Sequence, residues 1–177
     1  SISEQTVAAN TILLNFIMLS AYILDAYAFS TEGIVGYSIG SKNLKLLKDV
    51  IKNSFILNTV TGLVICLIVF LSKNYYIMLM TDLSAIREIS FSYSYWALII
   101  PFAASFCFLF DGIFIGASQT RELRNAMIAS VAIYIVVSFF LIASFGNTGL
   151  WLSLCIFFIA RALTLFVYMP RIYKRIS

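Results

Sequence analysis

Histidine is absent from this sequence of 177 residues, and charged side chains make up only 11% of it. The missing imidazoles remove the commonest general base and a common metal ligand, which argues against Ser/His proteases of the rhomboid type and against helix-borne zinc peptidases. Cys66, Cys107 and Cys155 are isolated in apolar runs, so their spacing indicates neither a metal cluster nor a disulfide framework. We interpret them as small apolar packing residues. The composition gives no reason to expect an enzyme or a bound cofactor.

Long apolar runs dominate what is present. Hydrophobic residues make up 62% of the chain, against about 45–50% in soluble domains. A helix of about 20 apolar residues crosses a bilayer and satisfies its own backbone hydrogen bonds, whereas the alternation typical of a membrane barrel is missing. The sequence therefore predicts an all-α integral membrane protein. The five predicted spans are about Val7–Ile39, which is long enough to be tilted or bent, Ser54–Ser72, Ser90–Phe110, Ala126–Ser144 and Leu150–Met169.

The net charge of +4 comes mainly from segments between the spans. Nine Lys and Arg residues fall on one side of the predicted membrane and two on the other. The positive-inside rule then places the N-terminus outside and the C-terminus in the cytoplasm. Because topology and the lipid bilayer account for these charges, we expect no nucleic-acid partner. The chain begins with Ser1, and complete proteins more often start inside, so we expect further spans upstream.

Two features are assigned to the membrane interfaces. Trp96, Trp151 and several tyrosines are expected in the belt of aromatic residues at the outer face. The stretch Ser41–Asn53 alternates leucines with four lysines, which predicts either a short amphipathic helix on the cytoplasmic surface or a solvated extension of the next span. The sequence does not decide between these two alternatives.

The first span contains two acidic residues, Asp25 and Glu32, and has no Lys or Arg between Ala8 and Ile39. A carboxylate at the membrane centre costs roughly 2.5–3.5 kcal/mol on insertion scales, so such residues normally face a bundle interior or a water-filled cavity. At 100° per residue they share a band of roughly 100° with other polar and small residues. This polar stripe consists of Thr11, Asn15, Met18, Tyr22, Asp25, Phe29, Glu32 and Gly36.

We expect Asp25 to be the ion-coupling residue, and Asn15 and Tyr22 to shape a substrate cavity beside it. Asn15 could instead belong to a hydrogen-bond network that only holds helices together. Glu32 lies nearer the cytoplasmic end, where it could snorkel or cap the helix. The opposite face, with Leu13, Ile17, Leu24 and Ile34, is expected to contact lipid.

Glycine and proline mark further contacts. Gly36 and Gly40 form a Gly-x-x-x-Gly pattern, which is typical of close helix packing or a bend. Pro101 removes a helical hydrogen bond and is expected to kink the third span. Asp111 ends that span, and Arg161 lies inside the fifth, where it must pair with a carboxylate, reach water or snorkel. Its candidate partners are Asp111 and Glu32, with an Asp25 pairing also open.

The segment Ala8–Gly40 contains Ala-Ala-Asn, then Tyr-Ile-Leu-Asp, then Val-Gly and a final Gly. This series resembles the multidrug and toxic compound extrusion (MATE) family in its DinF-like branch, although Ala26 replaces the usual Gly after Asp25. The later segment Phe110–Asn125, which starts Phe-Asp-Gly-Ile-Phe-Ile-Gly-Ala, is similar to the same branch. The resemblance runs in order along the whole chain.

The resemblance implies a fold of twelve helices in two lobes related by a pseudo-twofold, of which residues 1–177 would be helices eight to twelve of the C-terminal lobe. The family exports cationic or amphipathic compounds in exchange for protons or sodium, which implies a bacterial cytoplasmic (inner) membrane antiporter without further cofactors. In some branches an Asp at the position of Asp111 helps form a cation site. In the DinF-like branch, ion coupling is attributed mainly to an Asp in the N-terminal lobe. That lobe of the same protein would be the partner of this chain.

Three other functions are alternatives to transport of a small cationic substrate. A lipid-linked oligosaccharide flippase of the same superfamily would need a cationic cavity, and Arg161 is the one basic residue inside a predicted span. An intramembrane aspartyl protease would need two facing carboxylates such as Asp25 and Asp111, but its Gly-x-Gly-Asp motif is missing. A structural membrane subunit that does not transport is the third alternative.

Overall fold

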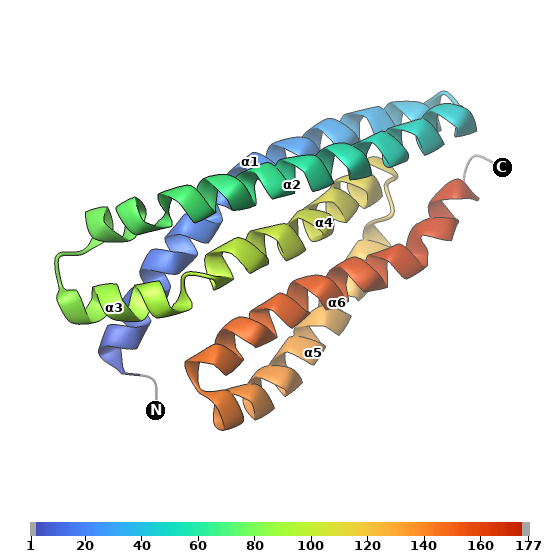
Figure 1. The fold of residues 1–177 in the computed structure, drawn as a ribbon. Coiled ribbons are helices and arrows are strands. Elements are labelled where there is room, and N and C mark those ends of the chain that lie inside the picture. The colour runs from blue at the N-terminus through green and yellow to red at the C-terminus, as the bar shows by residue number, and fades with distance from the viewer. Residues whose placement is uncertain (1–2, 175–177) are drawn as a thin grey trace.

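The computed structural model describes residues 3–174, and the regular structure in this part of the chain is helical throughout (Figure 1). Five helices are long and apolar enough to cross a membrane, which confirms the predicted class and number of spans. The helices are α1 (Glu4–Gly40), α2 (Leu44–Met80), α3 (Ser84–Tyr93), α4 (Trp96–Gly116), α5 (Thr120–Phe145) and α6 (Asn147–Tyr173).

Helix α2 includes the lysine-rich stretch that the sequence left undecided. The side chain of Asn43 caps this helix by accepting a hydrogen bond from the backbone N–H of Leu46 at 2.9 Å. From there the helix continues without interruption to Met80. The alternative of a helix extension is therefore confirmed, and the separate surface helix is wrong, because no Gly or Pro breaks the chain between the lysines and the apolar span.

The third predicted span is divided differently. The chain leaves α3 at Ser94 and Tyr95, and α4 starts only at Trp96 and runs to Gly116. Helix α4 continues through Pro101, so this proline does not end it. The kink expected there stays a prediction.

Helix α4 lies in the middle of the bundle, where it contacts α1, α2 and α6, while α5 packs mainly on α6 (Figure 1). Helices α5 and α6 form a hairpin joined by Gly146 alone, whose φ of 57° is strained for other residues.

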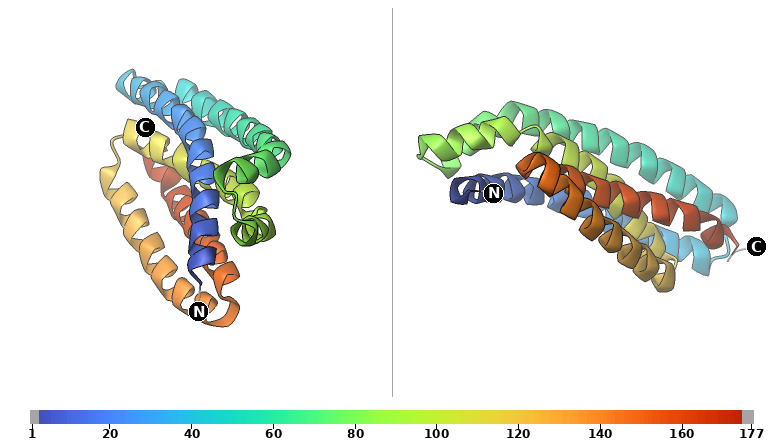
Figure 2. Two further views of the ribbon diagram at one scale, coloured as in Figure 1. Left: turned by 90° about the vertical axis from the view of Figure 1, so that its left-hand side faces the viewer. Right: turned by 90° about the horizontal axis from the view of Figure 1, so that it is seen from below.

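Helix α1 changes direction part-way along its length (Figure 2). Its Ser20 hydroxyl donates to the carbonyl of Phe16, a bond that often bends helices. One end of the bundle, here named the lysine end, carries Lys42, Lys45, Lys48 and Lys52.

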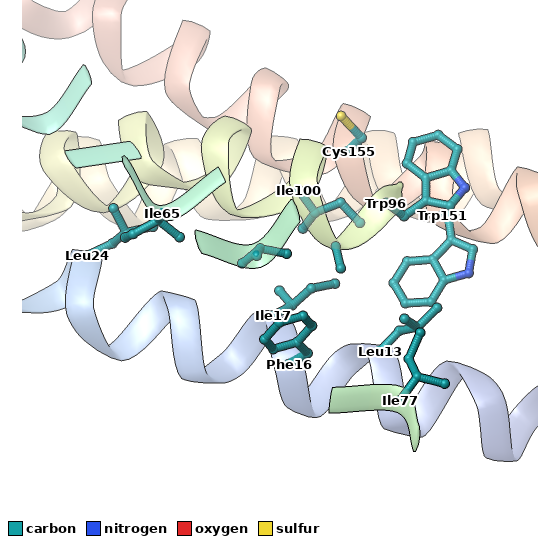
Figure 3. Close-up of a cluster of buried hydrophobic side chains, with 12 residues drawn as sticks. Leu13, Phe16, Ile17, Leu24, Ile65, Ile77, Trp96, Ile100, Trp151 and Cys155 are labelled. Atoms are coloured by element: carbon teal, nitrogen blue, oxygen red, sulfur yellow. The ribbon is translucent and has the colours of Figure 1, made fainter. Parts of the chain in front are cut away.

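Two apolar clusters form the core. The first, near α3, joins side chains of α1, α2, α4 and α6, among them Leu13, Trp96 and Trp151 (Figure 3). The second, toward the lysine end, includes Val35 and Phe114. Within α4, residues 101–108 contribute no buried member to either cluster, although Ala103 and Phe108 pack against the first. The buried core is thus divided along the length of the bundle. Buried polar side chains such as Ser105 lie between its two parts.

The faces of α1 differ from the prediction. Leu13, Ile17 and Leu24 are buried in the first cluster rather than turned to lipid, and only Ile34 of that predicted face is exposed. The polar stripe is instead the side of α1 that the other described helices leave uncovered. Most of its members are exposed, and three are half-buried, namely Asp25, Glu32 and Gly36. An amphipathic helix in a membrane buries whichever face its neighbours complement, and here the apolar face fits α2 and α4.

The two tryptophans also correct an expectation. Trp96 and Trp151 are 6% and 2% exposed, so they are core residues rather than members of an interfacial belt. The indole N–H of Trp151 donates to Asn10 at 3.1 Å, which satisfies its polar group inside the bundle.

Candidate functional site

A pair of opposite charges lies beside the second apolar cluster, because Asp111 follows Phe110 of that cluster on α4. An Nη2 of Arg161 on α6 lies 2.9 Å from Oδ2 of Asp111 on α4, and the two side chains are only 14% and 18% exposed. Burying either charge alone in a membrane-spanning helix would be costly. The predicted pairing of Arg161 with Asp111 is therefore confirmed, and it ties the outer hairpin to the central helix.

The pair is not fully engaged by the protein. Arg161 also donates from Nη1 to the sulfur of Met127 on α5 at 2.9 Å, and the Cys107 sulfur lies 4.0 Å from Oδ2 of Asp111. Both are weak partners for a charged group. Buried Oδ1 of Asp111 and Nε of Arg161 have no hydrogen-bond partner within residues 3–174. The carboxylate of Asp111 thus keeps one oxygen with unused lone pairs.

Asp25 on α1 lies close enough to Asp111 for the two charges to influence one another. Its side chain is half-buried at the inner edge of the polar stripe. The structure pairs Arg161 with Asp111 and not with Asp25. Asp111 is therefore compensated by Arg161, whereas no ion pair of Asp25 is found within residues 3–174. The three side chains together carry a formal excess of one negative charge when all are ionised.

Two glycines of α4 bring Asp111 this close to α1. A Cβ atom at Gly112 would overlap the carbonyl of Ala28, and one at Gly116 would overlap the carbonyl of Glu32. The backbones of α1 and α4 can therefore meet only because both positions lack a side chain, which is how small residues act in membrane helices. Asp111 precedes Gly112, and Asp25 is one turn before Ala28, so this contact builds the site.

The predicted packing motif of α1 is only partly right. A Cβ at Gly36 would lie 3.4 Å from the carbonyl oxygen of Gly116, so Gly36 is in the contact. Gly40 has nothing within 4 Å of that position, and its predicted role in close packing is wrong. The close-packing pair is Gly112 and Gly116, whose spacing is the same Gly-x-x-x-Gly.

The other predicted residues are not joined to the charged pair. Glu32 is half-buried, and no ion pair of its carboxylate is found within residues 3–174, so its predicted pairing with Arg161 is wrong. Asn15 and Tyr22 are exposed on the uncovered side of α1, with Tyr22 66% exposed. They lie on the same side of α1 as Asp25, but nothing in this chain encloses a cavity in front of them.

Comparison with known proteins gives the family. The model of the MatE family matches residues 1–140 of the chain. This chain belongs to the MatE family. The match covers α1 to α4 and most of α5, so it includes Asp25, Asp111 and the glycines between the two helices.

A curated relative and a solved structure agree with this assignment. The MatE chain is 30% identical over 138 residues to the DNA damage-inducible protein F of Escherichia coli strain K12, a match that covers 78% of this chain and 30% of the relative. Its fold matches the crystal structure of the eukaryotic MATE transporter AtDTX14 with a TM-score of 0.86 at 13% identity, over 98% of this chain and 42% of that one. The chain thus spans less than half the length of either protein, as part of a larger fold.

Sequence reasoning missed a buried polar clasp between α1 and α6 of the MatE chain. The side-chain amides of Asn10 and Asn147 exchange two hydrogen bonds of 2.6 and 3.0 Å, and Trp151 donates to Asn10. All three residues are buried. Asn10 belongs to the Ala-Ala-Asn string, but its partners lie 137 and 141 residues further along the sequence, so no local pattern pointed to them.

Two further polar contacts lie between the clusters. The amide of Asn58 on α2 donates to the hydroxyl of Ser105 on α4 at 3.2 Å, and Thr31 on α1 donates to Ser54 on α2 at 3.1 Å. The sequence signal that could have predicted the Asn58–Ser105 hydrogen bond is an Asn inside an apolar run. These two hydrogen bonds join α2 to α1 and to α4 between the apolar clusters.

Proposed function

We propose that this chain is one lobe of a secondary active antiporter that exports cationic or amphipathic compounds in exchange for protons or sodium. The MatE family match and the fold of a MATE transporter support transport. The five spans and the relative from Escherichia coli support a multi-pass protein of the inner membrane. The observation that carries the proposal is the group of Asp25, Asp111 and Arg161 inside the predicted spans, with its unbalanced negative charge.

The chemistry of this group suits a coupling site. Arg161 compensates one of the two carboxylates, so the remaining charge of Asp25 and Asp111 is available to a proton, to a sodium ion or to a cationic substrate. Neutralising that charge removes a desolvation cost of roughly 2.5–3.5 kcal/mol. Occupancy of the site therefore changes the relative free energies of the states of the transporter, which is what couples ion flow to substrate flow.

The polar stripe provides the surface on which transport would occur. Asn15 and Tyr22 lie on the uncovered side of α1, beside Asp25, and a membrane protein gains by turning such a face to water. In our proposal an N-terminal lobe of the same protein faces this side, and the two lobes rock around a central cavity to give alternating access. Glu32 then belongs to the cavity wall.

The alternatives fit the geometry less well. A flippase for phosphate-bearing lipids needs free cationic groups, whereas Arg161 is held by Asp111 and the local excess is negative. An aspartyl dyad needs two facing acids that share a proton, whereas Asp111 faces a guanidinium. A purely structural subunit would not require a half-buried Asp25, because an amide would hold helices at lower cost.

The proposal is tested by replacing Asp25 with Asn, which removes the charge and preserves the shape. The full-length protein that contains this lobe is purified and reconstituted into vesicles, a proton or sodium gradient is imposed, and export of a fluorescent lipophilic cation is followed. We expect Asp25→Asn to lose gradient-driven export while keeping normal expression and thermal stability. The control is Asp82→Asn, a fully exposed loop carboxylate, which should transport like the unchanged protein.

Undiminished export by Asp25→Asn would refute its role in coupling. If Asp25→Asn and Asp111→Asn both transport normally, the whole charged group is structural and the antiporter proposal loses its basis in this lobe. Gradient-driven movement of an anionic phosphate-bearing lipid, without movement of the cation, would favour the flippase.

A further inference from the structure

An apolar groove lies on the bundle between α2, α4 and α6, with a volume of about 770 Å³. Its walls include Phe55 and Leu63 of α2, Phe102 and Phe106 of α4, and Leu163 of α6. The polar stripe of α1 is no part of this lining, so the groove is separate from the proposed transport surface. Such a lining offers an occupant apolar contact and almost no hydrogen bonds.

The lysines of α2 continue the line of the groove toward the lysine end. At 100° per residue, Lys48 lies about 20° around the helix from Phe55, in the same direction as the groove residue Cys66. Lys52 and Lys45 lie about 60° and 80° from Phe55, close to the direction of Leu63. Both Lys48 and Lys52 are exposed, and no ion pair to either is found in the described part of the chain.

Helix α6 brings a further cation to the same end of the groove. Lys174 follows Leu163 by eleven residues, so it lies about 20° from it around the helix, and it is exposed. In Figure 1 the start of α2 and the end of α6 lie at the same end of the bundle. Helices α2 and α6 therefore both carry exposed lysines at the same end of the bundle.

The dimensions of the groove match one leaflet of a bilayer. On α4 the lining runs from Leu98 to Phe110, which is about 18 Å of helix at 1.5 Å per residue. One leaflet of the hydrocarbon core is about 15 Å thick. Lys48 is seven residues, or about 10 Å, beyond Phe55. The headgroup layer adds about 5–8 Å on each side of the hydrocarbon core, so the Lys48 side chain must extend back toward the groove to reach a phosphate.

We propose that this groove binds an anionic phospholipid, with an acyl chain between α2, α4 and α6 and its headgroup phosphate against Lys48, Lys52 and Lys174. The combination of an apolar groove with exposed, unpaired lysines toward one end favours this occupant. A helix of a second protein would fill the apolar part but would gain nothing from the aligned lysines. A lipid bound here would contact α2, α4 and α6 and leave the polar stripe of α1 free for transport.

The test is native mass spectrometry of the purified protein with equal amounts of phosphatidylglycerol and phosphatidylcholine carrying the same acyl chains. We expect the unchanged protein to retain phosphatidylglycerol preferentially. The variant Lys48→Gln/Lys52→Gln should lower that preference by about 25- to 30-fold, because each cation near an anionic surface contributes about 1 kcal/mol of attraction. The matched control Arg121→Gln/Arg124→Gln removes the same charge at the same end of the bundle, away from the groove, and should keep the preference.

A second pair of variants tests the apolar part. Ala103→Phe fills the groove and should reduce retention of both lipids, whereas Ala143→Phe on the exposed side of α5 should not. If Ala103→Phe fails to fold, the lysine pair decides alone. Equal retention of both lipids by the unchanged protein, or equal losses in the lysine and arginine variants, would overturn the proposal. Asp25→Asn should bind lipid normally, so a failure of transport and a failure of lipid binding are distinguished.

Discussion

The ion pair of Asp111 and Arg161 is the feature of this chain that depends most on single residues. Replacing both members of a buried pair by apolar groups is often tolerated, whereas removing one leaves an uncompensated charge and costs about 3–5 kcal/mol. Here the remaining charge would lie between α4 and α6, with only Met127 and Cys107 as weak neighbours. The two residues should therefore behave as one unit in stability as well as in transport.

This leads to a double-mutant cycle. Asp111→Asn and Arg161→Met should each lower the thermal stability of the detergent-solubilised protein, and the double variant should lose less than the sum. A coupling energy of about 0.5–3 kcal/mol is expected for residues in direct contact. Additive losses would show that the pair seen between α4 and α6 does not contribute to stability.

The clasp of Asn10, Asn147 and Trp151 gives a second prediction at this scale. Asn10→Ala leaves a buried amide and an indole N–H without their partner and should destabilise the protein by about 1–3 kcal/mol. Asn15→Ala, on the exposed side of the same helix, should change stability by less than about 0.5 kcal/mol. Thermal unfolding of the two variants side by side tests this; equal effects would contradict the buried network.

At the scale of elements, the contact of α1 with α4 positions the site. Gly112 and Gly116 allow backbone to meet backbone, so any side chain there must push the helices apart and move Asp111 away from Asp25. The contact also fixes which face of α1 is buried. Helix α1 consequently presents Asp25 at the boundary between protein interior and uncovered surface.

Gly112→Ala should therefore lower thermal stability and impair transport together. Gly33→Ala is the matched control, since a Cβ at Gly33 meets nothing within 4 Å and Ala is the better helix former by about 1 kcal/mol. We expect Gly33→Ala to be neutral or stabilising. Comparable damage from both variants would mean that flexibility of the glycines, rather than their size, is what matters.

The elements themselves were predictable from the sequence because hydropathy alone selects membrane spans. The faces of α1 were not, since an apolar face suits lipid and a protein core equally well, and only the neighbours decided that Leu13 and Leu24 are buried. The pairing of Arg161 could be narrowed to a few acids because an intramembrane cation needs a partner. The contact of Gly112 and Gly116 with α1 was not predicted, because Gly36 and Gly40 form the same Gly-x-x-x-Gly pattern. Only the positions of the helices show which of the two patterns lies against a neighbouring backbone.

For the whole molecule, the uncovered polar stripe of α1 is the feature with the widest consequence. In a bilayer such a face is stable only against water or against another polar surface. Tyr22 is 66% exposed and Val136 on α5 is 57% exposed, so the two differ little in accessibility within this chain. We expect water to cover Tyr22 and lipid to cover Val136.

Cysteine labelling distinguishes these surroundings. Tyr22→Cys should react with a membrane-impermeant maleimide in reconstituted vesicles, and Val136→Cys should not, with the unsubstituted protein as the background for its three cysteines. Addition of a transported cation should slow labelling at Tyr22→Cys. Labelling of both positions at the same rate would refute a water-filled cavity on the α1 side.

The hairpin of α5 and α6 has a consequence for biosynthesis. One residue, Gly146, separates two spanning helices, and one residue reaches at most about 3.6 Å, so neither helix can lie in the bilayer far from the other. The connection carries no charge, which lowers the cost of passing it across the membrane. We expect both helices to leave the translocation machinery as a single hairpin. Arg161 would then enter the lipid already beside Met127, before Asp111 takes it up.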